Sequence, residues 1–547
     1  LWRTALASCP SPVPILPKLY SPNLNGWSKS SNLVKIFKQM KSKSIFTFFL
    51  VNTLSAGIFL TEQSFAKDKP NILFFLVDDM GVGDTSVPFL YEVGKPKRIP
   101  TNDLYRTPHM EKLAKNGRLF TQAYSYSVCS PTRISLMTGQ AAPRHGVTTW
   151  THPKESKIDT GRVQTKTIKS PSDWTIKGLD LSLPLLPQVL LDSGYATLFA
   201  GKAHFGPDDT PAGNPLNLGF DVNIGGYGGG GPGSYHGKYK YSASWRSKNN
   251  HQWDVPGLEA YHPKDTFLSE AITLEMKKAI SKACKKKKPF YAYMSHYAVH
   301  APYEVDGRFK DNYPKLKGHA LAFATLVEGM DKSLGDLVTH LEREGVAEKT
   351  LIIFFSDNGS TFHVNAPFRD KKGSRFEGGL RVPLIVSWAK PNTNNPLQKN
   401  LNIPICSVDH SIITCVDMMP TILSITGAQT PDDAKMDGVD VSVAFRGDSS
   451  FESPSTFTTH FPHRHRNTLF STHRQDNWKI IYNYGSTNWE LYNLQTDPFE
   501  KNNLVTKEQD VAKRMGQSLL KILDSQGADY PVDLKTGKPV KPDLSKI

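Results

Sequence analysis

Two apolar runs that end abruptly in acidic residues place the strongest constraint on the fold of this chain. Residues 72–79 read ILFFLVDD, and residues 351–358 read LIIFFSDN. Continuous apolar runs of this length are typical of strands that are buried on both faces of a sheet. We therefore expect two such strands, each followed closely by acidic or amide side chains.

Helical periodicity separates these runs along the chain. Apolar residues recur at helical spacing in residues 110–116, 185–193, 267–284 and 320–344. Strands that alternate with helices indicate an α/β fold with a large, mostly parallel central sheet flanked by helices. In such folds, ligands bind at the carboxyl ends of the strands. The polar residues after the two runs are therefore well placed to form a site.

From about residue 451 the pattern changes to short alternating segments, such as residues 477–484 and 489–494. A chain of 547 residues is long enough for one large domain and a smaller one. We assign residues 67–450 to the large domain. We assign residues 451–547 to a smaller C-terminal α+β subdomain with an antiparallel sheet.

Residues 40–66 have the layout of a secretory signal peptide. Lysines precede an apolar run at residues 45–60, and a small-x-small cleavage site follows it. The run is short for a membrane span, so we expect no stable span after cleavage, with an uncleaved anchor as the alternative. The mature protein is expected to be exported, either periplasmic or secreted. Residues 1–39 are expected to come from an over-extended reading frame and to belong to no fold.

The formal net charge is +15, of which residues 1–66 contribute +6 and the remainder +9. A basic exported protein suits a polyanionic substrate, because a positive cleft attracts anions. A generally soluble basic protein explains the charge equally well. The sequence shows no regular basic and aromatic pattern and no nucleic-acid-binding motif, so we expect no nucleic-acid partner.

The cysteines after residue 66 are too few for a disulfide framework. Whether Cys406 and Cys415 pair is left open by the sequence. The cysteine spacing does not indicate a zinc site. Residues 225–233 contain seven glycines without the ending of a phosphate-binding loop, and we expect a flexible loop near the cleft.

The polar pairs after the apolar runs are candidate metal ligands. Asp78 and Asp79 follow the first run, and Asp357 and Asn358 follow the second. Clustered carboxylates repel one another unless a cation neutralises them, and oxygen donors suit calcium or magnesium. The alternative is that these residues cap helices or begin turns.

One further segment resembles a known signature. Residues 129–133 read CSPTR and are followed by Thr138 and Gly139, which resembles the signature of type I (formylglycine-dependent) sulfatases, arylsulfatase-like members of the alkaline phosphatase superfamily. Further motifs that resemble the family lie in residues 194–206, 295–302 and 372–383. One departure is Ala203, where a tryptophan is common. The resemblance covers roughly residues 69–505 and implies an alkaline phosphatase-like sandwich, with residues 67–450 as the catalytic domain.

The resemblance implies a modified nucleophile and a metal ion. Cys129 would be oxidised to Cα-formylglycine by a formylglycine-generating maturation enzyme, and the hydrated aldehyde would attack sulfur. The ion at Asp78, Asp79, Asp357 and Asn358 would be Ca²⁺, with Mg²⁺ as the second choice. A proline near residue 129 suits the first turn of a helix, whose N-terminus favours an anion.

The resemblance also implies roles for charged and titratable side chains. Lys202 and Lys372 would hold the sulfate oxygens, and Arg133 would stabilise the ionised hydrate. Fixed cations of this kind stabilise the charge that develops in the transition state, typically by about 3–4 kcal/mol for one donor. His300 would protonate the departing alcohol. His204 would help to deprotonate the second hydroxyl when the sulfated intermediate collapses.

These observations predict a sulfuric ester hydrolase that removes sulfate from a sulfated carbohydrate, either a polysaccharide or an oligosaccharide. A phosphonate monoester or phosphodiester hydrolase of the same superfamily is the first alternative. A catalytically silent glycan-binding homologue is the second, although every site position that the sequence reveals is intact.

Overall fold

The first apolar run forms strand β1 (Asn71–Val77), and the second forms strand β9 (Thr350–Ser356). Both strands are buried along their whole length. The computed structural model describes residues 69–92, 94–154, 167–171, 178–362, 366–448, 456–465 and 468–547. The predicted signal peptide and the predicted domain boundary at residues 450 and 451 lie outside these ranges. The described residues all belong to one unit of the chain.

Over the described ranges, the central sheet has eight strands in the order β11-β4-β10-β9-β1-β8-β6-β7. The other strands are β4 (Arg118–Tyr124), β6 (Ala196–Gly201), β7 (Val222–Ile224), β8 (Phe290–Ser295), β10 (Arg381–Trp388) and β11 (Ser407–Thr414). Strand β10 is antiparallel to both neighbours, and the other described pairings in this sheet are parallel. The predicted large, mostly parallel sheet is confirmed.

The two faces of the sheet carry separate hydrophobic cores, because side chains alternate along each strand. Leu73 and Phe75 of β1 pack in one core, whereas Phe74 and Leu76 pack in the other. The first core includes residues of α2 (Pro108–Lys115), α6 (Leu268–Lys285) and α7 (Gly318–Arg343). The second includes residues of α3 (Cys129–Thr138), α5 (Leu186–Asp192) and α10 (Met418–Thr426).

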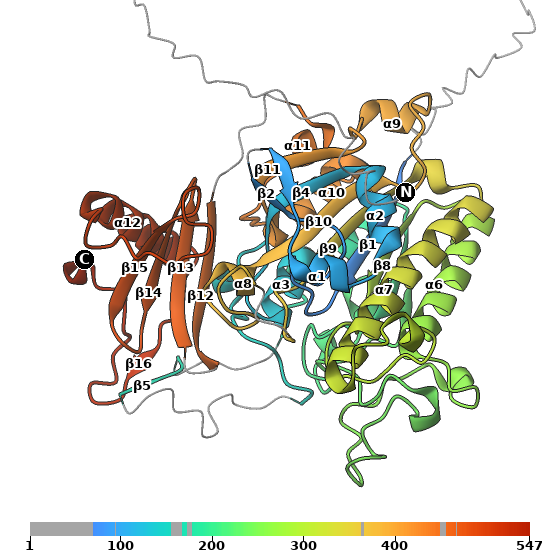
Figure 1. Cartoon of the computed structure of the whole chain (residues 1–547), viewed down its shortest axis with the longest axis horizontal. Helices are drawn as coiled ribbons and strands as arrows, with labels where there is room; N and C mark the ends of the chain where they lie inside the picture. The colour runs from blue at the N-terminus through green and yellow to red at the C-terminus, as the bar shows by residue number, and fades with distance from the viewer. Residues whose placement is uncertain are drawn as a thin grey trace, which may run out of the picture. The chain divides into compact units, whose positions relative to one another are not determined.

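Helices α2, α5, α6 and α7 confirm the predicted helical segments, with ends within two residues of the expected positions. Figure 1 shows α6 and α7 side by side along one face of the sheet, where they contact each other. Shorter helices are α1 (Pro100–Leu104), α4 (Ala142–His145), α8 (Glu377–Leu380), α9 (Pro396–Asn400) and α11 (Ser442–Arg446). Within the described residues, no helix has the length and apolar character that a membrane crossing needs.

The C-terminal part contains an antiparallel sheet, as predicted. Its strands are β12 (Thr456–His465), β13 (Thr468–Gln475), β14 (Trp478–Asn483) and β15 (Asn488–Asn493), paired in chain order. Helix α12 (Gln509–Ser525) packs against this sheet through a core that includes Leu519. Short strand pairs are β2 (Leu90–Glu92) with β3 (Lys95–Lys97), and β5 (Ile168–Lys169) with β16 (Val532–Asp533).

The cysteine question left open by the sequence has a definite answer. Cys415 is a buried free thiol, so it does not pair with Cys406. Cys129 is also a buried free thiol. It is therefore not consumed by a disulfide.

Candidate active site

The predicted site residues converge at one edge of the central sheet. Strands β1 and β9 are hydrogen-bonded neighbours in which Val77 lies opposite Ser356, so the polar pairs after both strands meet. Strands β6 and β8 run in the same direction and end at the same edge, where they deliver Lys202 and His300. Strand β10 runs the opposite way, so the loop before it arrives at this edge and carries Lys372.

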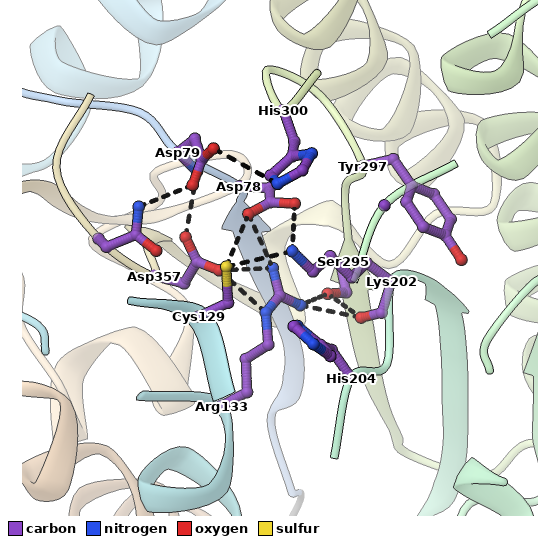
Figure 2. A network of polar contacts seen from close by, with 12 residues as sticks. Asp78, Asp79, Cys129, Arg133, Lys202, His204, Ser295, Tyr297, His300 and Asp357 are labelled. Atoms are coloured by element: carbon purple, nitrogen blue, oxygen red, sulfur yellow. Dashed lines mark hydrogen bonds and ion pairs between the residues drawn. The ribbon is translucent and has the colours of Figure 1, made fainter. Parts of the chain in front are cut away.

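Buried ions of opposite charge hold the centre of the site together (Figure 2). Lys202 Nζ lies 2.7 Å from Asp78 Oδ2, and Lys372 Nζ lies 2.5 Å from Asp79 Oδ1. Arg133 Nη2 lies 2.8 Å from Asp357 Oδ2. Because carboxylates and cationic groups are matched, the buried charges compensate one another.

Cys129 is the first residue of α3 and lies between the two lysines. Its Sγ is 3.3 Å from Lys202 Nζ and 3.1 Å from Lys372 Nζ. Asp78 Oδ1 lies 3.7 Å from the same sulfur on another side. Residue 129 therefore stands at a helix N-terminus, beside two ammonium groups, where an anion is favoured.

Arg133 reaches the site from behind Cys129. Its Nη1 donates hydrogen bonds to the carbonyl oxygen of Lys202 at 2.9 Å and to Ser295 Oγ at 2.7 Å. Its Nε donates to Asp357 Oδ2 at 2.9 Å. One guanidinium thus fixes the end of β6, the end of β8 and the residue after β9.

Burial shapes the protonation of these groups. Burial raises the pKa of the Cys129 thiol to about 12, although the two lysines oppose this shift. Burial also raises the pKa of Asp357 to about 6, and the charge of Asp78 adds to the rise. For Asp79, burial is outweighed by Lys372, His300 and Lys202, so the net shift of its pKa is downward. The thiol is therefore protonated at neutral pH, and Asp79 is ionised.

The donor set at this edge fits a hard divalent cation. Ligand atoms of Asp78, Cys129 and Asp357 all lie within 4.8 Å of one another. Within the described part of the chain, the buried Oδ1 of Asn358 has no hydrogen-bond partner. Its Nδ2 donates to Asp79 Oδ1 at 2.8 Å, which orients the amide toward the carboxylates. Buried oxygens in such an arrangement are what calcium or magnesium uses as ligands.

His204 and His300 have their tautomers set by neighbouring carbonyls. His204 Nε2 donates to the carbonyl oxygen of Thr151 at 2.9 Å, and its buried Nδ1 has no hydrogen-bond partner among the described residues. His300 Nδ1 donates to the carbonyl oxygen of Ala301 at 2.7 Å, and its Nε2 lies 3.7 Å from Asp79 Oδ2. Burial lowers the pKa of His300 to about 3 and that of His204 well below its usual value. Each neutral ring therefore keeps one nitrogen able to accept a proton.

The predicted glycine-rich loop covers both histidines. A Cβ at Gly230 would lie 2.7 Å from the His204 ring, and one at Gly231 would lie 2.9 Å from the His300 ring. Side chains here would displace the imidazoles, which explains why the chain uses glycine at these two positions. The predicted placement of this loop near the cleft is confirmed.

A cavity of about 620 Å³ opens above residue 129. Cys129, His204, His300 and Lys372 line it together with aromatic and polar side chains. The added lining residues that the sequence did not single out include Trp150, His152, Arg246, Trp253 and Thr361. The Thr361 hydroxyl donates a hydrogen bond to Asp79. Its position three residues after Asn358 could have indicated this role from the sequence. The wall residues come from separate loops, and no local motif marks them.

Comparison with protein families agrees with this geometry. The family model described as Sulfatase matches residues 70–428, and the model described as N-sulphoglucosamine sulphohydrolase, C-terminal matches residues 368–525. N-acetylgalactosamine-6-sulfatase of Mus musculus is 29% identical over 391 residues, which cover 69% of this chain and 66% of that protein. The chain thus spans slightly less than two thirds of that relative's length. A sulfatase of Formosa agariphila is 25% identical over 512 residues, covering 83% of this chain and 88% of that protein.

Solved structures share the architecture. A crystal structure of Ps i-CgsB in complex with k-i-k-neocarrahexaose superposes with a TM-score of 0.67 at 25% identity, covering 83% of this chain and 93% of the other. The PsFucS1 sulfatase from Pseudoalteromonas sp. has a TM-score of 0.62 at 21% identity, covering 87% and 92% of the two chains, and shares the fold. With the Sulfatase model matched over residues 70–428, the chain belongs to the sulfatase family, among the type I sulfatases of the alkaline phosphatase superfamily.

Proposed function

We propose that this protein hydrolyses sulfate esters of carbohydrates. The observation that carries the proposal is the position of residue 129 at a helix N-terminus, between the ammonium groups of Lys202 and Lys372. A sulfate ester is a tetrahedral anion, and more negative charge develops on its leaving oxygen in the transition state. Fixed positive groups in a buried site stabilise such charge better than water does.

The cavity above residue 129 supports a carbohydrate as the rest of the substrate. Trp150, Trp253 and Arg246 line the same cavity, so it combines aromatic side chains with a cationic one. Mixed apolar and polar walls of this kind are typical of ligand pockets. A relative named N-acetylgalactosamine-6-sulfatase and a structural neighbour in complex with k-i-k-neocarrahexaose support the same substrate class. The proposal includes export directed by residues 40–66, and a secreted protein that retained this segment would contradict it.

We further propose that Cys129 is converted to Cα-formylglycine by a maturation enzyme. A thiol whose pKa is raised to about 12 is protonated at neutral pH and is a weak nucleophile. The hydrated aldehyde instead offers two hydroxyl groups on one carbon. One hydroxyl passes its proton to Asp357 and forms the bond to sulfur while the bond from sulfur to the alcohol oxygen breaks. The second hydroxyl then loses its proton, the aldehyde re-forms, and sulfate departs.

The chain's ionic groups have separate tasks in this scheme. Lys202 and Lys372 bind the sulfate oxygens, and Arg133 keeps Asp357 and the end of β6 in place while favouring negative charge at residue 129. The side chains that would hold Ca²⁺ are Asp78, Asp79, Asp357 and Asn358. When bound, the ion supplies Lewis-acid polarisation of a sulfate oxygen.

The histidines move protons at defined atoms. His300 Nδ1 donates a hydrogen bond to the carbonyl oxygen of Ala301, so the proton for the leaving alcohol is carried at Nε2. The negative charge of a bound sulfate ester favours this proton, because it raises the lowered pKa of the ring. From that atom it protonates the departing alcohol. His204 keeps Nδ1 available as an acceptor and takes the proton of the second hydroxyl as the intermediate collapses.

The proposed reaction is tested directly with chromogenic esters. The matured protein should hydrolyse an aryl sulfate far faster than the matching aryl phosphate or phosphonate, and Cys129→Ala should abolish turnover because it removes the nucleophile. The variant should keep its melting temperature, which serves as the folding control. A preference for the phosphonate or phosphate ester would replace the proposal with its phosphoryl alternative, and binding of sulfated glycans without turnover would indicate a silent homologue.

Removal of divalent ions should abolish activity and lower the melting temperature of the mature protein. The ion would bind only the folded state, and a ligand at 100 times its dissociation constant stabilises by about 2.7 kcal/mol. Titration with Ca²⁺ should restore both properties. Asp78→Asn should weaken the Ca²⁺-dependent rise in melting temperature. Full activity after exhaustive chelation would argue against a metal at this site.

Replacement of His300 by alanine should slow alkyl sulfates about 10²–10⁴-fold, the usual contribution of a general acid. Aryl sulfates should lose much less, because their leaving groups depart without a proton. The comparison of kcat for paired alkyl and aryl substrates measures this difference. Equal losses for both substrates would show that His300 is not the leaving-group acid.

A further inference from the structure

The loop that carries Lys372 is held from the side of the C-terminal sheet. This Lys372 loop, residues 369–380, lies between β9 and β10 and ends in the short helix α8. A Cβ at Gly378 would lie 2.2 Å from the carbonyl oxygen of Asp370, and one at Gly379 would lie 2.6 Å from that of Ser374. The loop is therefore too tight for side chains at these two positions. Phe376 and Glu377 of this loop contact residues of β14 and β15.

Alternation along β14 and β15 gives the C-terminal sheet two different faces. Ile480 and Leu491 point to one face and pack in the core against α12. Ile481 and Tyr492 point to the other face and pack with Phe376 of the Lys372 loop. Lys479 lies two residues before Ile481, so its side chain points to the same second face, where it is almost fully buried. A lysine buried in that position needs acidic partners.

Lys479 finds these partners in two buried glutamates. Its Nζ lies 3.0 Å from Glu377 Oε1 and 2.8 Å from Glu500 Oε1. Glu500 Oε2 accepts a hydrogen bond from the backbone N–H of Glu377 at 2.7 Å. Glu377 Oε2 accepts another from the Tyr124 hydroxyl at 2.6 Å. Glu377 belongs to the Lys372 loop, so one ammonium group ties that loop to the C-terminal sheet.

Cation–π contacts add to this attachment. The guanidinium of Arg369 lies 3.7 Å from the centroid of the Phe376 ring, and that of Arg375 lies 4.3 Å from it. Arg369 also donates to the backbone carbonyl of Glu500 at 3.0 Å, and Arg375 pairs with Glu490 of β15 at 3.1 Å. Arg369 and Arg375 thus fix two separate points of the Lys372 loop to the C-terminal part of the chain.

The same sheet also contacts the segment that leads to residue 129. Phe461 of β12 and Phe470 of β13 form a buried cluster with Val128, the residue before Cys129. The backbone N–H of Gly373 donates to the carbonyl oxygen of Ser127 at 2.7 Å. The position of Lys372 relative to residue 129 is therefore set by contacts that meet on one face of the C-terminal sheet.

We propose that Lys479 is a positioning residue for the reaction. Through Glu377 and Glu500 it fixes the Lys372 loop, and so keeps the Lys372 ammonium group beside residue 129. This inference rests on the proposed sulfatase function. Lys479 does not line the cavity, so its effect on catalysis passes through Lys372. A displacement of about 1 Å of a binding group is enough to slow an enzyme about 10²-fold.

A double-mutant cycle with Lys479→Met and Lys372→Ala separates positioning from plain structural support. Lys479→Met alone should lower kcat/KM for an aryl sulfate about 10- to 100-fold. In the Lys372→Ala background the same change should have almost no further effect on kcat/KM, because residues that act through one another are non-additive. Its effect on the melting temperature should be the same in both backgrounds.

Leu519→Ala is the matched control. It removes buried apolar contacts from the opposite face of the C-terminal sheet and should lower the melting temperature without changing kcat/KM. If Lys479→Met does not fold, Glu500→Gln provides the second test, because glutamine keeps the side-chain shape and can still accept from the Glu377 N–H. It should lower kcat/KM in the same direction, again only when Lys372 is present.

Different failures have different meanings. The positioning role would be overturned if the losses in kcat/KM of the two single variants multiplied in the double variant. It would also be overturned if Lys479→Met or Glu500→Gln were as active as Leu519→Ala. Either result would leave the sulfatase proposal intact. A wild-type protein with no activity on sulfate esters would instead overturn the proposed function itself.

Discussion

Buried groups of opposite charge surround residue 129. The rest of the site depends on the balance between the negative carboxylates and the positive ammonium and guanidinium groups. Lys202 and Lys372 face Asp78 and Asp79, and Arg133 faces Asp357. A buried charge without a partner is strongly destabilising, so each group needs its opposite. A divalent ion added to this compensated set would leave an excess of positive charge. That excess suits a substrate that brings its own negative charge.

The topology of the sheet explains how distant parts of the chain supply these groups. Parallel strands β1, β6, β8 and β9 end at one edge, and side chains after their ends meet there. Strand β10 is antiparallel, which brings the Lys372 loop to the same edge from the opposite chain direction. The C-terminal sheet then packs against that loop and against Val128. Cys129, Lys202, Lys372 and the supporting sheet thus form one connected structure.

The sequence predicted the two buried strands β1 and β9 and the helices α2, α5, α6 and α7, because each has a local pattern. The lysines and histidines of the site were instead singled out through a family resemblance, and their roles stay predictions. Buried strands β1 and β9 have continuous apolar runs, and α6 and α7 have clear helical spacing. The antiparallel direction of β10 and the pairing of Lys479 with Glu377 could not be predicted, since both depend on contacts between residues far apart in the chain. The exact tautomers of His204 and His300 also depend on carbonyls that only the fold brings near.

In the proposed reaction, residue 129 acts as an aldehyde hydrate and not as a thiol. Mass spectrometry of the peptide spanning residues 128–133, taken from protein preparations with measured sulfatase activity, tests this most directly. We expect the aldehyde or its hydrate at residue 129, with specific activity proportional to the converted fraction. Active protein in which this peptide carries only an unmodified cysteine would contradict it.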